Sequence, residues 1–105
     1  MSWPFRLTTK AAEDIDEIWW FIAADSTDAA DRVEAEIISA CHQLAKYPLI
    51  GMRRRDITDL PLRFWTITKF PNYVIVYRPD TVPLQVMAVL HGKRNLKDVL
   101  KKRPL

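Results

Sequence analysis

Residues Leu62 to Leu90 have the sequence LRFWTITKFPNYVIVYRPDTVPLQVMAVL, which carries the clearest fold signal in the chain. It contains three runs typical of strands, residues 62–68, 73–78 and 84–90, separated by two short connections that contain proline. Connections this short join antiparallel neighbours, because a parallel crossover needs a dozen residues or more. The last two runs are nearly all apolar, which is expected at the centre of a sheet beneath a layer of helices.

Upstream of this stretch, the spacing of apolar residues predicts two amphipathic helices. The first covers residues 10–22, with Thr8 or Thr9 as its N-terminal cap. The polar segment 25–28 interrupts the pattern and can cap a second helix. Pro48 and Gly51 are expected to end that helix. Because the link between the two helices is so short, we expect an antiparallel helical hairpin.

The two ends of the chain complete the expected fold. Near the N-terminus, the large apolar residues Trp3, Phe5 and Leu7 occupy every second position. This alternation predicts an N-terminal strand with one buried face. Asn95 can cap a short C-terminal helix. The predicted class is therefore α+β, with an N-terminal strand, an antiparallel helical hairpin packed on an antiparallel β-sheet, and a short C-terminal helix. A length of 105 residues suits a single domain, residues 1–105.

The composition excludes several classes of site. Two glycines do not make a phosphate-binding loop, and one cysteine with two histidines does not make a zinc-ligand cluster, so we expect no cofactor and no metal. Cys41 lies on the apolar side of the second predicted helix and is expected in the core. The N-terminus lacks the pattern of a signal peptide, and no apolar run approaches the roughly 20 residues of a membrane span. We therefore expect a cytoplasmic protein without a membrane partner.

The formal net charge of +3 conceals a division along the chain. Residues 1–46 hold four basic and nine acidic side chains, whereas residues 47–105 hold twelve basic and only four acidic ones. This asymmetry indicates a face that meets an acidic partner, which nucleic acid, an acidic protein segment or an acidic enzyme surface would provide. The alternative is that the helices simply carry acids near their N-termini, so that no partner is implied.

Short motifs follow one another along the chain in an order that resembles a known family. They are Trp20-Phe21-Ile22-Ala23, Tyr47-Pro48-x-x-Gly51, Leu62-Arg63-Phe64-Trp65, Tyr73-Val74-Ile75-Val76-Tyr77-Arg78 and Val89-Leu90-His91-Gly92-Lys93-Arg94. Each motif alone is weak, but together they span nearly the whole chain. Their order and spacing resemble the RelE/ParE toxin superfamily, and within it the ParE-like branch of plasmid-stabilisation proteins.

The ParE-like resemblance implies the toxin of a type II toxin–antitoxin pair, which inhibits DNA gyrase by binding and performs no chemistry of its own. The basic second half of the chain would then meet an acidic or DNA-bearing surface. The candidate target-binding residues are Arg53, Arg54, Arg55, Lys93 and Arg94. The alternative for the arginine run is a merely solvated loop.

The other hypothesis is a RelE-like, ribosome-dependent mRNA endoribonuclease, with Arg63, Arg78, His91 and Arg94 as its catalytic candidates. Such a reaction needs a base, an acid and cations around the phosphate. Antiparallel pairing predicts that Arg63 and Arg78 lie at the same end of the sheet. The resemblance implies a catalytic Tyr or His near the C-terminus in nuclease branches, whereas neither residue type follows His91 here. This departure favours the gyrase-binding hypothesis.

Either hypothesis implies an antitoxin, ParD-like or related, whose flexible C-terminal segment wraps the toxin. The candidate antitoxin-binding residues are Trp19, Trp20, Phe21, Arg63 and Arg78. Three consecutive aromatic residues cannot all face the core from one helix, so an exposed patch is expected unless the sheet and the C-terminal helix cover them. A third hypothesis is a small interaction module without toxicity, or a degenerate toxin.

Overall fold

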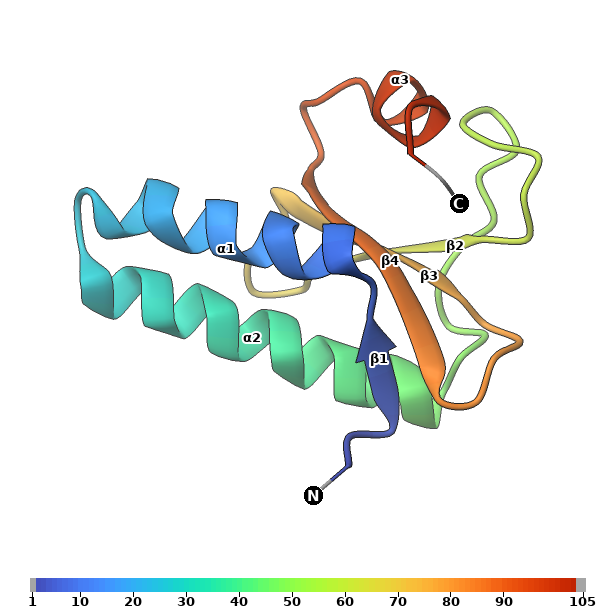
Figure 1. Ribbon diagram of the computed structural model, residues 1–105, viewed down its shortest axis with the longest axis horizontal. Coiled ribbons are helices and arrows are strands. Elements are labelled where there is room, and N and C mark those ends of the chain that lie inside the picture. Colours follow the sequence, from blue (N-terminus) through green and yellow to red (C-terminus); the bar gives the residue numbers. More distant parts are fainter. Residues whose placement is uncertain (1, 104–105) are drawn as a thin grey trace.

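The computed structural model describes residues 2–103 and contains the predicted elements in the predicted order (Figure 1). They are β1 (Phe5–Leu7), α1 (Thr9–Ala23), α2 (Thr27–Lys46), β2 (Arg63–Thr66), β3 (Tyr73–Arg78), β4 (Leu84–His91) and α3 (Leu96–Lys101). Helices α1 and α2 form the expected antiparallel hairpin, which lies on one side of the sheet. None of the helices within residues 2–103 combines the length and the apolar character that a membrane crossing requires.

The sheet has the strand order β1-β4-β3-β2, and its register corrects one part of the predicted class. The last three strands are antiparallel, as predicted from their short connections. Strand β1, however, runs parallel to β4, with Phe5 opposite Leu84, so the sheet is mixed and not antiparallel. The reason is that β1 and β4 are joined through the helical hairpin and two other strands, so no short turn constrains their relative direction.

Side-chain caps explain where the two helices of the hairpin begin. The hydroxyl of Thr8 accepts a hydrogen bond from the backbone N–H of Ala11, and the hydroxyl of Ser26 accepts one from Ala29. Each bond satisfies one of the N–H groups that the first turn of a helix leaves without an internal partner. The hairpin turn is therefore encoded locally.

The helical face of the sheet carries the larger core. Side chains from α1, α2 and alternate sheet positions pack there, among them the fully buried Ile37, Leu44, Ile75 and Val86. Cys41 lies in this core, as predicted, and burial raises the pKa of its thiol to about 12. A thiol in this setting is an apolar packing group.

The opposite face of the sheet has a smaller cover. The irregular segment 52–61 and α3 lie over it, away from the helical hairpin (Figure 1). Its core contains Val76 and Leu90 from the strands and Leu62 just before β2, and α3 adds the single buried residue Leu100. Fewer buried apolar side chains therefore pack on this face than on the helical face.

Beyond the end of β1, side chains make hydrogen bonds to the backbone groups of β4 that have no neighbouring strand. The hydroxyl of Thr8 donates to the carbonyl oxygen of Met87 at 3.3 Å, and the Asp14 carboxylate accepts from the N–H of Val89 at 3.0 Å. Arg103 donates two hydrogen bonds to the same carboxylate, at 2.6 and 2.7 Å. Asp14 therefore satisfies a strand edge and joins α1 to the segment that follows α3.

A second polar cluster holds the turn between α2 and β2. The buried Tyr77 hydroxyl donates to the carbonyl oxygen of Pro48 at 2.7 Å and accepts from the N–H of Gly51 at 2.9 Å. Arg63 donates to the carbonyl oxygens of Gly51 and Leu49 at 2.7 and 3.3 Å. A Cβ at position 51 would collide with the Tyr77 hydroxyl, so the close approach of this turn to β3 requires glycine.

Candidate interaction surfaces

The tip of the helical hairpin exposes aromatic side chains, as the sequence predicted. Trp20 is 71% exposed and Phe21 is 78% exposed, whereas Trp19 is half-buried. The indole N–H of Trp19 donates to the Asp31 carboxylate on α2 at 2.8 Å, and its ring meets that of Trp20 edge to face. Trp19 therefore joins the two helices, and its neighbours present an apolar surface to solvent.

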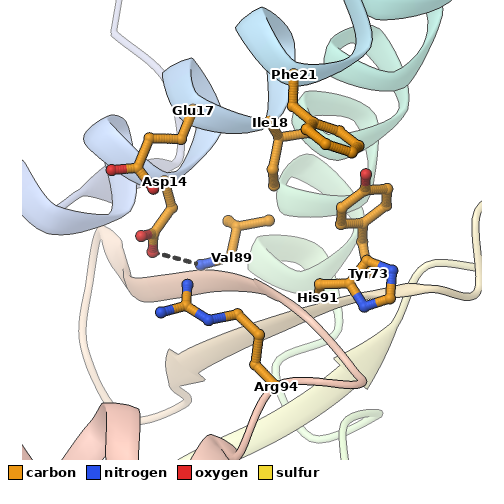
Figure 2. A pocket seen from close by; sticks show the side chains of 8 residues that line it. All are labelled: Asp14, Glu17, Ile18, Phe21, Tyr73, Val89, His91 and Arg94. Carbon is orange, nitrogen blue, oxygen red and sulfur yellow. Dashed lines mark hydrogen bonds between the residues drawn. The ribbon is translucent and has the colours of Figure 1, made fainter.

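A groove of about 320 Å³ begins beside Phe21, between α1 and the ends of β3 and β4 (Figure 2). Ile18, Val89 and the rings of Phe21 and Tyr73 form its apolar part. Asp14, Glu17, His91 and Arg94 supply the polar groups around it. Such a groove suits an apolar side chain with a polar group next to it. Sequence analysis missed Ile18, Glu17 and Tyr73 here, because their meeting depends on how α1 crosses the sheet.

His91 is engaged locally within this groove. Its Nδ1 accepts a hydrogen bond from the backbone N–H of Lys93 at 3.1 Å, and its ring packs edge to face on Tyr73 at 5.5 Å between centroids. Partial burial raises the pKa of the Tyr73 hydroxyl above its usual value. The histidine thus helps to shape the turn after β4.

The four residues of the ribonuclease hypothesis do not gather in one place. Arg63 pairs with Tyr77 in the register, so it lies beside Arg78 at one end of β3, as predicted. His91 pairs with Tyr73 at the other end of β3, and Arg94 lines the groove there. A strand of this length separates the two pairs by roughly 17 Å. The four candidates of the ribonuclease hypothesis therefore do not share one site, although Arg63 and Arg78 lie together.

Arg63 and Arg78 also lie away from the hairpin tip. The guanidinium of Arg63 donates to carbonyl oxygens of the 48–51 turn. Burial raises the pKa of the neighbouring Tyr77 hydroxyl, and the Gly51 N–H and the charge of Arg63 offset part of that rise. Arg78 is half-buried at the end of β3 and makes no ion pair within residues 2–103. The structure therefore does not unite these arginines with Trp20 and Phe21 in one surface.

Around the turn after α2 lies an apolar patch that sequence analysis did not identify. Tyr47, Leu49 and Met52 are each more than half exposed, and Ile50 is 37% exposed. The Tyr77 hydroxyl and Arg63 hold the backbone of this turn from below. The sequence offered a weak signal for it, namely four large apolar residues around a proline and a glycine.

The basic residues predicted to bind the target lie on two sides of α3. Segment 52–61 packs against α3, since residues 57–60 and Lys97 line one hollow of about 370 Å³. Within this segment, Arg54 forms a two-point ion pair with Asp56, while Arg53 and Arg55 are exposed. Lys93 and Arg94 precede α3 on the groove side, and Arg94 borders a second hollow beside α3. The candidates thus flank one helix without forming a single continuous cluster.

Sequence reasoning missed the largely buried ion pair between Arg103 and Asp14. Asp14 was expected as one of several acids that favour the start of the first helix, but its side chain is only 6% exposed and pairs with Arg103. The hydrogen bonds to Asp14 raise the pKa of the Arg103 guanidinium above its usual value. Among residues 2–103, no group of three or more His, Cys, Asp or Glu side chains is placed to hold a metal ion.

Comparison with known proteins agrees with this architecture. Residues 5–96 match the model of a family described as the ParE toxin of the type II toxin–antitoxin system, parDE. The chain is 34% identical over 95 residues to the candidate toxin Y4kP of Sinorhizobium fredii (strain NBRC 101917 / NGR234), covering 90% of this chain and 94% of that protein.

Among solved structures, a chain of the chromosomal ParDE TA system from P. aeruginosa superposes with a TM-score of 0.66 at 19% identity. The match covers 83% of this chain and 92% of that chain, and it supports the fold. Arg103 lies beyond the residues that match the family model. On the extent of the family match and the identity to its relative, this chain belongs to the ParE toxin family of type II toxin–antitoxin systems.

Proposed function

We propose that this toxin acts in the cytoplasm by binding DNA gyrase, without chemistry of its own, and that a ParD-like antitoxin neutralises it. The observation that carries the proposal is the separation of Arg63 and Arg78 from His91 and Arg94 at opposite ends of β3. Acid–base cleavage of RNA needs its groups within hydrogen-bond reach of one phosphate. A toxin without that constellation is better suited to act by binding.

The target would meet the basic side of the molecule. Arg53 and Arg55 are exposed and make no ion pair within residues 2–103, and Lys93 and Arg94 are also exposed. Exposed cations of this kind raise the rate and the specificity of association with an acidic or DNA-bearing surface. Arg54 contributes less in the free protein, because Asp56 pairs with it.

A supercoiling assay with purified gyrase tests the target. Reversing the charge of Arg53, Arg54 and Arg55 to Glu is expected to raise the inhibitory concentration about tenfold or more, because a like charge would replace attraction. The matched control reverses Arg6, Arg32 and Lys46, which lie on β1 and α2. Equal potency of both variants would remove the arginine run from the interface. No inhibition by the unmodified toxin would remove gyrase as the target.

Induction of the toxin alone in a bacterial host separates the two target hypotheses. Gyrase inhibition predicts DNA-damage signalling and filamentation while the incorporation of labelled amino acids continues for the first minutes. An immediate stop of amino-acid incorporation would instead favour the ribonuclease hypothesis. Normal growth would support the module without toxicity.

The antitoxin would dock on the hairpin tip and the neighbouring groove. Trp20 and Phe21 offer exposed aromatic anchors, and the groove beside Phe21 has Arg94 at its rim. A flexible segment with apolar anchors and acidic side chains fits both features. Arg63 and Arg78 lie outside this surface, at the far end of β3.

Titration of the toxin with the protein encoded beside it tests this surface. Changing Trp20 and Phe21 together to Ser is expected to weaken the complex by about 30-fold or more, since buried aromatic anchors commonly dominate an interface. Trp3→Ser is the control, because Trp3 is also exposed but lies before β1, stacked on Phe5. Unchanged affinity in the double variant would move the antitoxin elsewhere.

A further inference from the structure

Five cations surround the short helix α3, and they define the α3 basic surface: Lys93, Arg94, Lys97, Lys101 and Lys102. All five are exposed, and none forms an ion pair within residues 2–103. The helix carries one acid, Asp98. This part of the molecule therefore presents concentrated and uncompensated positive charge.

Several other cations of this chain are compensated. Lys10 pairs with Glu13, Lys69 with Glu36, and Arg103 with the buried Asp14. The pair between Arg103 and Asp14 also holds the end of α3 in place, because it joins α1 to the segment after Lys101. A buried ion pair thus anchors a helix whose remaining charges face solvent.

The surroundings of the surface indicate its partner. Protein interfaces are depleted in lysine and are built around apolar or aromatic anchors, whereas interfaces with DNA are polar and strongly positive. Four of the five cations are lysines, and the exposed aromatics Trp20 and Phe21 lie on α1. Leu60, an exposed large apolar side chain at 38%, lines the hollow beside α3. The chemistry therefore favours phosphates over an apolar protein surface.

The absence of aromatic rings from this set selects the form of the nucleic acid. Proteins that hold single strands stack bases on aromatic side chains, and residues 93–103 contain no aromatic side chain. A six-residue helix is about 9 Å long, so its cations lie within the length of about three base pairs. Residues 57–60 line one hollow together with Lys97, so segment 52–61, which carries the exposed Arg53 and Arg55, lies beside this surface.

We propose that the α3 basic surface binds the phosphate backbone of duplex DNA without reading its sequence. This activity belongs to the toxin alone and goes beyond the choice of gyrase as its target. Binding would place the toxin on DNA before, or while, it meets an enzyme that holds DNA. It would leave Trp20 and Phe21 on α1 free, whereas Arg94 also borders the groove proposed for the antitoxin.

Fluorescence anisotropy of a short labelled duplex, without gyrase or antitoxin, tests the proposal. The toxin is expected to bind at about 50 mM salt and to lose affinity steeply toward about 200 mM. Changing Lys97, Lys101 and Lys102 together to Gln should reduce the slope of log affinity against log salt by about 2.7, if each lysine neutralises one phosphate. The single strand of the same sequence should show a shallower slope.

The matched control removes the same charge elsewhere, by changing Arg6, Arg32 and Lys46 to Gln. It should keep the slope of the unmodified toxin, and circular dichroism should show both variants folded. No binding at low salt, or an equal loss in the two variants, would overturn the proposal. Displacement of the duplex by polyglutamate at a lower charge concentration than by unlabelled DNA would also overturn it, in favour of an acidic protein partner. Because gyrase is absent, these results are independent of the supercoiling assay.

Discussion

The two faces of the sheet are stabilised in different ways. Helices of 15 and 20 residues cover one face and place apolar side chains such as Ile37 and Leu44 against the strands. The other face is covered by the irregular segment 52–61 and a helix of six residues, which buries only Leu100 completely. Apolar burial thus dominates on the helical face and is limited on the other.

The limited apolar cover of this second face explains why a buried ion pair occurs there. A helix as short as α3 is marginal in isolation, because helix nucleation is unfavourable and few turns follow it. The two hydrogen bonds from Arg103 to Asp14 attach its C-terminal end to α1, across the open edge of β4. The lightly covered face is therefore held by polar anchors, and its outer surface is free to carry charge.

The largest expected effect comes from the helical face. Leu44→Ala removes a fully buried side chain between α2 and the sheet and is expected to cost about 4 kcal/mol of unfolding free energy. Urea denaturation measures the loss. Leu49→Ala is the control, because the same change at a 68% exposed site should cost less than about 0.5 kcal/mol. Similar losses in both variants would show that the helical face is not the dominant core.

Breaking the anchor of the other face should have the next largest effect. Arg103→Gln leaves the Asp14 carboxylate buried without its cation and is expected to cost about 2–3 kcal/mol. Asp14→Asn should cost less, because its amide oxygen can still accept from Val89 and Arg103 can turn to solvent. The double variant should be less harmful than the sum, whereas strict additivity would mean that the two residues do not interact.

The turn held by Tyr77 provides a sharper test of local packing. Gly51→Ala forces a Cβ into the Tyr77 hydroxyl and is expected to cost about 2 kcal/mol in thermal or urea unfolding. Tyr77→Phe should relieve part of that cost in the double variant. Gly92→Ala is the matched control, because its Cβ would lie 3.5 Å from the nearest atom, the carbonyl oxygen of Asn72. An equal cost at both glycines would argue against the clash.

The smallest expected effect completes the comparison of the two faces. Leu100→Ala truncates the buried residue of α3 and is expected to cost about 1–2 kcal/mol, because a short helix near the chain end can move to close the gap. Hydrogen exchange should show the amides of α3 opening well before those of α2. A loss as large as that of Leu44→Ala would mean that the two faces contribute equally.

Local patterns in the sequence accounted for much of the fold. The three antiparallel strands, the helical hairpin, the cap at Thr8 and the buried position of Cys41 all agree with the prediction. Each depends on residues close together in the chain, where periodicity and turn length carry the information. The same kind of argument predicted that Trp19, Trp20 and Phe21 could not all face the core, and Trp20 and Phe21 are the two that are exposed.

The candidate site was less predictable, because its residues meet across long sequence separations. The groove joins Ile18 on α1 to Tyr73 and His91 on two strands, and no spacing in the sequence marks that meeting. The set of Arg63, Arg78, His91 and Arg94 had compatible chemistry, yet the register places them at opposite ends of β3. Residue types indicated possible reactions, but their distances depended on strand pairing.

By itself, the sequence determined the order of the elements, the apolar faces and the uneven distribution of charge, because these follow from short-range propensities and composition. The tertiary structure alone decided that β1 runs parallel to β4 and that Asp14 meets Arg103, 89 residues away. Asp14 and Arg103 meet because β1 is short, which leaves backbone groups of β4 beyond it without a neighbouring strand. The N–H group of Val89 and the carbonyl group of Met87 need partners there, and only the folded chain brings α1 and the segment after α3 close enough to supply them.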